Sequence, residues 1–190
     1  MVYYNKFSKG VGNIMATNTY RKGQAVKLSA NFNSSEFDCH GSGCCSETII
    51  NPQLVKYLQQ IRDHFKAPIT ITSAYRCPVH NSRIGGATRS QHCQGNAADI
   101  VVKGVSSREV AKYAESIGIK GIGLYETSAD GYFTHIDTRT SKAFWYGQNE
   151  QPRTTFGENS GSTTVTIDTT NNSSTTVSLN DTGVVVKEIQ

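Results

Sequence analysis

The sequence predicts a fold that mixes α-helices with β-strands, because two kinds of apolar spacing alternate along the chain. Leu54, Leu58 and Ile61 recur four and three residues apart, which is typical of an amphipathic helix. The run Ile69-Thr-Ile-Thr is instead short and rich in β-branched residues, which is typical of a strand. With 190 residues, the chain is long enough for one domain of ordinary size and an appendage.

Three parts are expected along the chain. Residues 1–27 form a largely polar N-terminal extension, and a domain over residues 28–150 follows, beginning with an extended lead-in that ends at Phe37. Residues 151–190 form a tail in which Thr, Ser and Asn dominate from Gly157 onward. Short runs such as Val-Thr-Ile alternate in this tail, so we expect β-strands that dock on a partner, with a disordered low-complexity segment as the alternative.

Two helices are expected in the domain. The first covers residues 52–66, with Asn51 as its N-cap and Pro52 at its first helical position. The second covers residues 107–117 and is capped by one of the two serines at its start. Gly118 ends this second helix, because glycine readily adopts the conformation that terminates one.

Strands are expected at three further places, each marked by a short β-branched or alternating run. They cover residues 100–102, 121–125 and 132–138, and Phe144-Trp-Tyr closes the domain. Residues 78–87 are expected to form a loop that turns at its pair of glycines.

Charge and hydropathy limit the partners that we expect. The net charge of +4 is mild and no dense basic run is present, so nucleic acid is not an expected partner. No apolar stretch approaches the ~18 residues that a membrane-spanning helix needs. The first residues lack the apolar core of a secretory signal, so we expect synthesis in the cytoplasm and another route to any extracellular site.

Five cysteines are an odd number, so a complete set of disulfides would leave one over. Cys39, His40, Cys44 and Cys45 have the ligand types of a second zinc site, although not the usual paired Cys-x-x-Cys spacing. Free thiols in a reducing compartment are the alternative, and the one we favour.

His92 and Asp99 supply half of a predicted metal site, because a ring nitrogen and a carboxylate oxygen both bind divalent metals well. Gly95 between them permits the sharp reversal that lets both meet on one ion. His135, on another strand-like segment, is the best candidate for the third ligand. Two histidines and one carboxylate leave a coordination position open, which is typical of a catalytic zinc that activates water and polarises a carbonyl.

Arg76 follows directly on the first predicted strand. Its planar fork suits a substrate carboxylate or a tetrahedral oxyanion, and an ordinary surface ion pair is an equal alternative. The pair His135-Ile-Asp137 also occurs in iron oxygenases that hold the metal with two histidines and a carboxylate. Those enzymes usually take their second histidine downstream, and no histidine follows His135 here. This order disfavours iron and makes Asp137 a partner of a metal ligand rather than a ligand.

The residues Ser90, His92, Gly95, Ala97 and Asp99 together match the motif Ser-x-His-x-x-Gly-x-Ala-x-Asp. In this motif the chain resembles the zinc D-Ala-D-Ala carboxypeptidases and related peptidoglycan peptidases, a fold shared with phage endolysin peptidases. Three further segments resemble that family's arginine segment, the loop after it and its last ligand strand, namely residues 69–76, 84–88 and 133–137. The resemblance covers roughly residues 28–147.

The resemblance implies an α+β fold, with a small antiparallel sheet, helices packed on one side and one catalytic Zn²⁺ ion in a cleft. It implies cleavage of peptidoglycan stem peptides or cross-bridges, as a D,D-carboxypeptidase or an endopeptidase. By position in the motif, His92, Asp99 and His135 would hold the zinc. Arg76 would stabilise the oxyanion or bind substrate, and Ser90 would contact substrate.

Many members of that family carry an acidic residue three positions before the last histidine as general acid and base, but Tyr132 stands there in this chain. Asp130 and Glu126 are the nearest acids, and we expect Asp130 to take the role, ahead of Asp137. General acid–base help is worth roughly 10²–10⁴-fold in rate. Without it, activity would be weak or absent, and the alternative function is that of a non-catalytic, zinc-containing protein that binds the wall or forms part of a virion.

A peptidase of this family without a leader resembles a phage-encoded wall-degrading enzyme. It would reach peptidoglycan after lysis or as part of a virion or tail-like particle. In the second case, residues 157–190 would attach it to the phage tail or to tail-like particle proteins.

Overall fold

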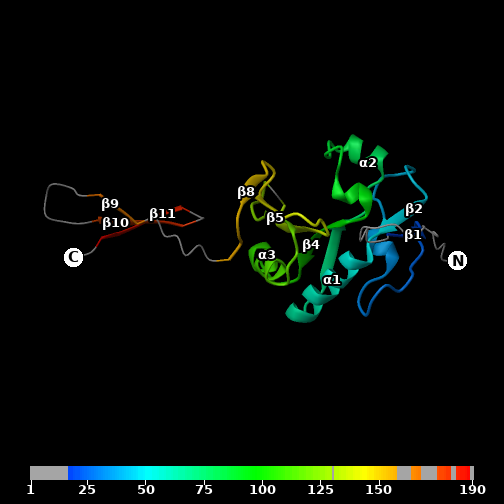
Figure 1. The fold of residues 1–190 in the computed structure, drawn as a ribbon, viewed down its shortest axis with the longest axis horizontal. Helices are drawn as coiled ribbons and strands as arrows, with labels where there is room; N and C mark the ends of the chain where they lie inside the picture. Colours follow the sequence, from blue (N-terminus) through cyan, green and yellow to red (C-terminus); the bar gives the residue numbers. More distant parts are fainter. Residues whose placement is uncertain (1–16, 130, 158–163, 168–174, 181–182, 189–190) are drawn as a thin grey trace. The chain divides into compact units, whose positions relative to one another are not determined.

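The computed structural model describes residues 17–129, 131–157, 164–167, 175–180 and 183–188. Residues 1–156 and 157–190 belong to two separate compact units (Figure 1). The first unit extends past the expected domain end at residue 150, because residues 151–153 pair with the edge of its sheet and Phe156 is buried in its core.

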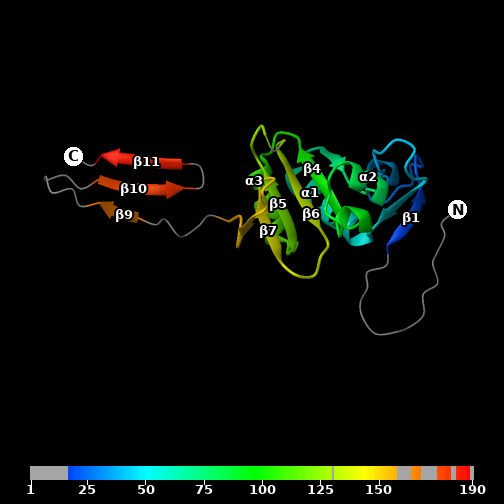
Figure 2. The same ribbon diagram turned by 90° about the horizontal axis from the view of Figure 1, so that it is seen from above.

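A six-stranded sheet forms the centre of the described part of the first unit (Figure 2). Its strands, in spatial order, are β3 (Ile69–Ser73), β4 (Ala97–Val102), β6 (Phe133–Asp137), β5 (Gly121–Tyr125), β7 (Ala143–Tyr146) and β8 (Gln151–Arg153). Neighbours are antiparallel except β5 and β7, which run parallel. The expected α+β fold is confirmed, with this larger sheet mixed and a second, two-stranded sheet antiparallel.

One row of paired residues crosses four strands of this sheet. Asp99 on β4 lies opposite His135 on β6, and His135 lies opposite Gly123 on β5. Gly123 in turn lies opposite Trp145 on β7. Directly opposed residues point to the same face of a sheet, so these four positions share one face.

Helices α1 (Pro52–Phe65) and α3 (Ser107–Ser116) pack on the other face of the sheet (Figure 1). The apolar strand residues one position away from the row are fully buried there, namely Ile100, Ile122 and Ile136. The two expected helices and their place on one side of the sheet are confirmed. Each begins at a cap in the expected place, because the Asn51 side chain accepts a hydrogen bond from the Gln53 amide and the Ser106 side chain from the Glu109 amide.

Three segments differ from the sequence-based expectation. The polar N-terminal extension contains β1 (Asn18–Arg21), which pairs antiparallel with β2 (Glu47–Ile50). The extended lead-in ends in a 3₁₀ helix, η1 (Ser34–Phe37). The loop expected over residues 78–87 begins with a short helix, α2 (Pro78–Arg83). Proline at the first helical position, and a Cys77 sulfur that accepts the His80 amide hydrogen, favour this helix.

The second unit contains a three-stranded antiparallel sheet. Its strands are β9 (Thr164–Ile167), β10 (Thr175–Asn180) and β11 (Gly183–Glu188), with β10 in the centre. Strands were the expected structure of this tail. Among the described residues of the whole chain, no helix combines the length and the apolar character needed to cross a membrane.

Candidate metal centre

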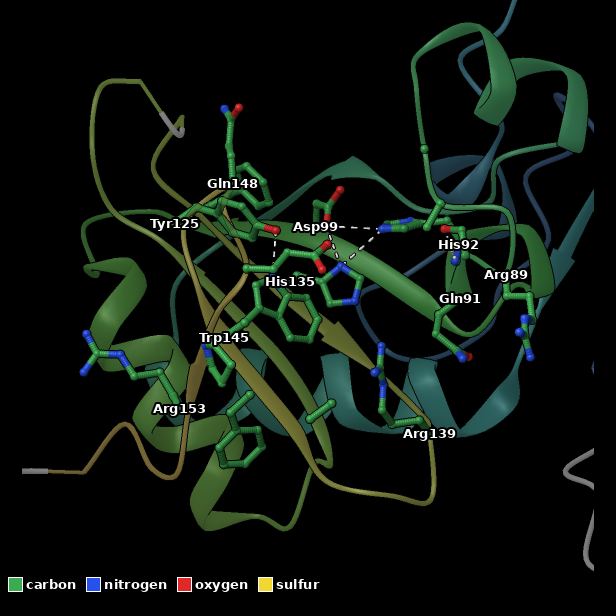
Figure 3. A pocket seen from close by; sticks show the side chains of 18 of the residues that line it. Arg89, Gln91, His92, Asp99, Tyr125, His135, Arg139, Trp145, Gln148 and Arg153 are labelled. Atoms are coloured by element: carbon green, nitrogen blue, oxygen red, sulfur yellow. Dashed lines mark hydrogen bonds and ion pairs between the residues drawn. The ribbon is translucent and has the colours of Figure 1, made fainter.

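The structure brings His92, Asp99 and His135 together from three separate elements (Figure 3). His92 lies in the 3₁₀ helix η2 (Gln91–Gln94), whose cap Ser90 accepts a hydrogen bond from the His92 amide at 3.3 Å. Gly95 ends this turn at a φ of 70°, in the left-handed region that favours glycine. The chain thereby turns back into β4, which carries Asp99 opposite His135 on β6.

The three candidate donor atoms have the spacing that a tetrahedral ion requires. His92 Nε2 lies 3.2 Å from His135 Nδ1 and 3.4 Å from Asp99 Oδ1. His135 Nδ1 lies 2.9 Å from Asp99 Oδ1. Ligands at 2.0–2.1 Å from a tetrahedral zinc ion are about 3.3–3.4 Å from one another. All three residues are more than nine-tenths buried, so few water molecules compete for these atoms.

Each histidine is fixed by its other ring nitrogen. His92 Nδ1 lies 2.7 Å from the carbonyl oxygen of Ala74, which only accepts hydrogen bonds, so this nitrogen carries the proton. His135 Nε2 lies 3.1 Å from Asp137 Oδ2, and Arg139 pairs with the same carboxylate at 2.6 Å. Such outer contacts orient metal-binding histidines in known metalloproteins. Each ring therefore presents an unprotonated nitrogen to the centre when the imidazole is neutral.

Burial and hydrogen bonding act against each other on the pKa values of the site. Burial alone would raise the pKa of Asp99, but hydrogen bonds with His135 and His92 lower it below its usual range. Burial would likewise lower the pKa of His135, but Asp137 and Asp99 raise it to about 9. For His92, burial dominates and lowers the pKa. The two carboxylates thus favour a positive charge at His135, whereas burial disfavours one at His92.

Arg76 contacts the candidate metal centre directly. Its guanidinium pairs with Asp99 Oδ2 at 2.6 Å, while its Nε donates to Ser73 Oγ at 2.7 Å. The Arg76 side chain is 19% exposed and lines the cleft described below. The ion pair is therefore partly buried and turns the second oxygen of Asp99 away from the donor cluster, in contrast to the surface pair that the sequence left open.

Among the described residues, few acidic side chains are placed to act as the general acid and base. Asp130, the expected residue, lies outside them. Glu126 forms an ion pair with Arg108, and Tyr132 is 57% exposed and does not line the cleft. Asp137 holds His135 and lies fully buried behind it. The sequence analysis overlooked Glu150, which lines the same cleft as the candidate ligands.

A cleft of about 1030 Å³ opens over the donor cluster. Five cationic residues line it, namely Arg76, Arg89, Arg139, Lys142 and Arg153, against the two carboxylates of Asp99 and Glu150. Ser90 also lines the cleft, as a contact with substrate would require. The surplus of positive charge suits a substrate that carries carboxylates.

Trp145 and Tyr125 form an aromatic wall beside His135, as Figure 3 shows. The ring centroids of Trp145 and His135 are 5.0 Å apart, and Trp145 Nε1 donates to the Tyr125 hydroxyl at 2.8 Å. Gly123 makes room for this ring, because a Cβ there would lie 2.5 Å from the indole. The sequence analysis missed this wall, since an aromatic residue in a strand pattern is equally typical of a core.

Comparisons with known proteins give a consistent result. The family model described as Peptidase M15 matches residues 30–137, which include all three candidate ligands. The peptidoglycan L,D-endopeptidases MepK of Escherichia coli (strain K12) and of Shigella flexneri are each 30% identical to this chain over 96 residues. The match covers 47% of this chain and 51% of each relative, so the chain spans about half the length of the curated relatives it matches.

Proposed function

The chain belongs to the peptidase M15 family, and from this premise we propose that it is a zinc-dependent peptidase that hydrolyses peptide bonds of peptidoglycan. The observation that carries this proposal is the buried cluster of two imidazole nitrogens and one carboxylate oxygen at the base of a cleft. The resemblance of the chain to peptidoglycan endopeptidases supports the choice of substrate.

His92, Asp99 and His135 would hold the ion. Two nitrogens and one oxygen at tetrahedral spacing suit Zn²⁺, and a set of three protein ligands leaves room for a reactant. A bound zinc ion would supply activation of a water molecule and polarisation of the scissile carbonyl. The hydrogen bonds that His92 donates to the Ala74 carbonyl and that His135 donates to the Asp137 carboxylate support this assignment, because they leave the inner nitrogen of each neutral imidazole free to bind the ion.

The cleft residues would bind and orient the peptide. Stem peptides of peptidoglycan carry carboxylates, and Arg89 on one wall is an exposed cation within the lining. Arg76 would hold Asp99 in place and contact the substrate carbonyl as charge develops on its oxygen. Ser90 would contact the substrate backbone from the rim, and Trp145 would cover one side of the reacting bond.

A carboxylate would take a proton from the attacking water and deliver it to the leaving amine. We propose Asp130 for this role because it lies five residues before His135 in the sequence, between β5 and β6. Glu150 is the rival, since it lines the cleft. Replacing the true residue by its amide should lower kcat by roughly 10²–10⁴-fold. Asp130→Asn and Glu150→Gln therefore separate the two, with each variant serving as the control for the other.

The test of the function is digestion of purified peptidoglycan, with products identified by mass spectrometry. We expect soluble products from the zinc-loaded protein, none after chelation, and recovery when zinc is restored. Release of terminal D-Ala would indicate a carboxypeptidase, and split cross-links or stem peptides an endopeptidase. His135→Ala should abolish the products, whereas His64→Ala should not, because His64 stacks on Tyr113 outside the cleft.

A non-catalytic wall-binding protein is the second candidate, and the exposed Tyr132 at the position usual for an acid favours it. This candidate predicts intact peptidoglycan in the digestion, together with co-sedimentation of the zinc-loaded protein with purified sacculi. Zinc-dependent cleavage would exclude it.

We further propose that the protein acts within a phage life cycle, after lysis or as part of a virion or tail-like particle. The separate β-rich unit over residues 157–190 supports an attachment role, because a sheet with open edges can pair with another chain. Deleting residues 157–190 should leave cleavage of soluble peptidoglycan fragments unchanged and remove the protein from purified particles. Equal recovery of both forms from particles would contradict this attachment.

A further inference from the structure

Four of the five cysteines lie together at a point outside the cleft. Cys39 follows η1, Cys44 and Cys45 lie in the loop before β2, and Cys77 lies between β3 and α2. Their sulfur atoms all lie within 4.8 Å of one another. The sequence analysis had placed His40 in this set, but His40 is exposed and Cys77 takes its place, because the fold returns the end of β3 to the cysteine-rich loop.

The distances between these sulfur atoms are those of a metal site rather than of a disulfide. The Sγ atoms of Cys39 and Cys44 are 3.6 Å apart, and those of Cys44 and Cys45 are 3.7 Å apart. A disulfide bond is about 2.05 Å long. Four sulfur atoms at about 2.3 Å from a tetrahedral zinc ion are about 3.8 Å from one another. These two distances therefore match the edges of a zinc tetrahedron, and all four sulfur atoms lie within 4.8 Å of one another.

Two of the four sulfur atoms accept hydrogen bonds from backbone amides. The Cys77 amide donates to Cys39 Sγ and the His80 amide donates to Cys77 Sγ, each at 3.4 Å. Cys39 and Cys77 are almost fully buried, and Tyr75 packs against them and shields them from water. Such backbone N–H groups stabilise negative charge on sulfur.

The loop is also shaped to let these sulfur atoms meet. A Cβ at Gly41 would collide with Cys44 Sγ and with the side chain of His80, so only glycine permits this approach. The ammonium group of Lys22 donates to the Gly41 carbonyl at 3.0 Å and thus places a positive charge beside the cluster. Four thiolates around a divalent ion carry a net charge of −2, which a neighbouring cation offsets.

We propose that Cys39, Cys44, Cys45 and Cys77 bind a second zinc ion whose role is structural. Four protein ligands fill a tetrahedral zinc ion, so no position is left for water or substrate. This site is distinct from the candidate catalytic centre and shares no ligand with it.

The second zinc would fix the segment that supports the catalytic centre. Cys77 directly follows Arg76, which pairs with Asp99, and it lies three residues after Ala74, which binds His92. Tying Cys77 to the loop that carries Cys39 therefore limits the movement of both supports. These residues act by position and take no part in the reaction.

The test is the zinc content of the purified protein and its variants, measured by mass spectrometry of the metal. We expect two zinc ions per chain in the natural sequence, one in His135→Ala, one in Cys77→Ser and none in the double variant. Cys93→Ser is the matched control and should keep both, because Cys93 lies outside the cluster. An unchanged zinc content in Cys77→Ser would overturn the proposal. Zinc content is measured without any assay of peptidase activity. The proposed cysteine site can therefore be refuted while the proposed function holds, and the proposed function can be refuted while the cysteine site holds.

A measurement on the unaltered protein covers the case in which Cys77→Ser does not fold. A thiol reagent should label one cysteine in the native zinc-loaded protein, Cys93, and all five after denaturation with release of zinc. Replacement of zinc by cobalt should also give the absorption band of thiolate-to-cobalt charge transfer. Rapid labelling of all five thiols in the native state would contradict the site. Fewer than five thiols after denaturation would indicate disulfides, and would also overturn it.

Discussion

Replacing Gly123 by alanine should disturb the cleft through a single side chain. The added Cβ would lie 2.5 Å from Cε2 and 2.6 Å from Nε1 of Trp145, where an ordinary contact is 3.4–4 Å. The indole cannot move freely, because its Nε1 donates to the Tyr125 hydroxyl and its ring contacts both His135 and Arg139. Overpacking of this kind costs about 1–3 kcal/mol. For a chain of this size, the loss should lower Tm by roughly 2–12 °C.

Fluorescence reports on this site without ambiguity, since Trp145 is the only tryptophan in the chain. We expect Gly123→Ala to shift the emission to longer wavelength, because the ring is pushed toward solvent. A double-mutant cycle provides the control: Gly123→Ala should cost about 0.5–3 kcal/mol less in a Trp145→Leu background than in the natural sequence, which is the usual interaction energy of residues in contact. An unchanged emission spectrum and Tm in Gly123→Ala, or an equal cost in both backgrounds, would refute the reasoning.

Three other changes test separate parts of the molecule. Asp137→Asn removes the negative charge that faces His135 Nε2. We expect the zinc affinity of the His92–Asp99–His135 centre to fall by roughly 10–100-fold, measured by competition with a chromophoric chelator, while the four-cysteine site keeps its ion. Arg89→Ala removes an exposed cation from the cleft wall, so it should raise KM for peptidoglycan fragments several-fold and leave kcat unchanged. Arg83 lies on α2 and does not line the cleft, and an equal rise in KM in Arg83→Ala would argue against this role of Arg89. Asn51→Ala removes the N-cap of α1 and the hydrogen bonds that the Asn51 side chain donates to Asn96 and Thr138. Urea denaturation should show that the free energy of unfolding falls by about 2–3 kcal/mol. A decrease of less than about 0.5 kcal/mol would contradict the capping role.

Local signals in the sequence were sufficient for the two helices, for the strands β3, β5 and β6, and for the pairing of His92 with Asp99, whereas the resemblance to a known family supported His135 as the third ligand. A helix of this kind depends on the spacing of its apolar residues and on a cap such as Asn51, and both features can be recognised from a short stretch of sequence. The first part of the ligand set was likewise readable, because His92, Asp99 and the turn at Gly95 lie within ten residues. Short elements without such signals, such as β1 and α2, were missed, since pairing partners and tertiary contacts stabilise them.

What the sequence determined by itself was therefore the set of chemical groups and the local turns that present them. Only the tertiary structure decided which distant groups meet. Cys77 joins Cys39 across 38 residues, Trp145 reaches His135 through the parallel pairing of β5 and β7 over Gly123, and Arg76 pairs with Asp99 instead of lying on the surface. Contacts of this kind depend on the order of the strands and on the packing of a shared core. The spacing of neighbouring residues does not encode them, because the free energy that stabilises them comes from many buried contacts throughout the core.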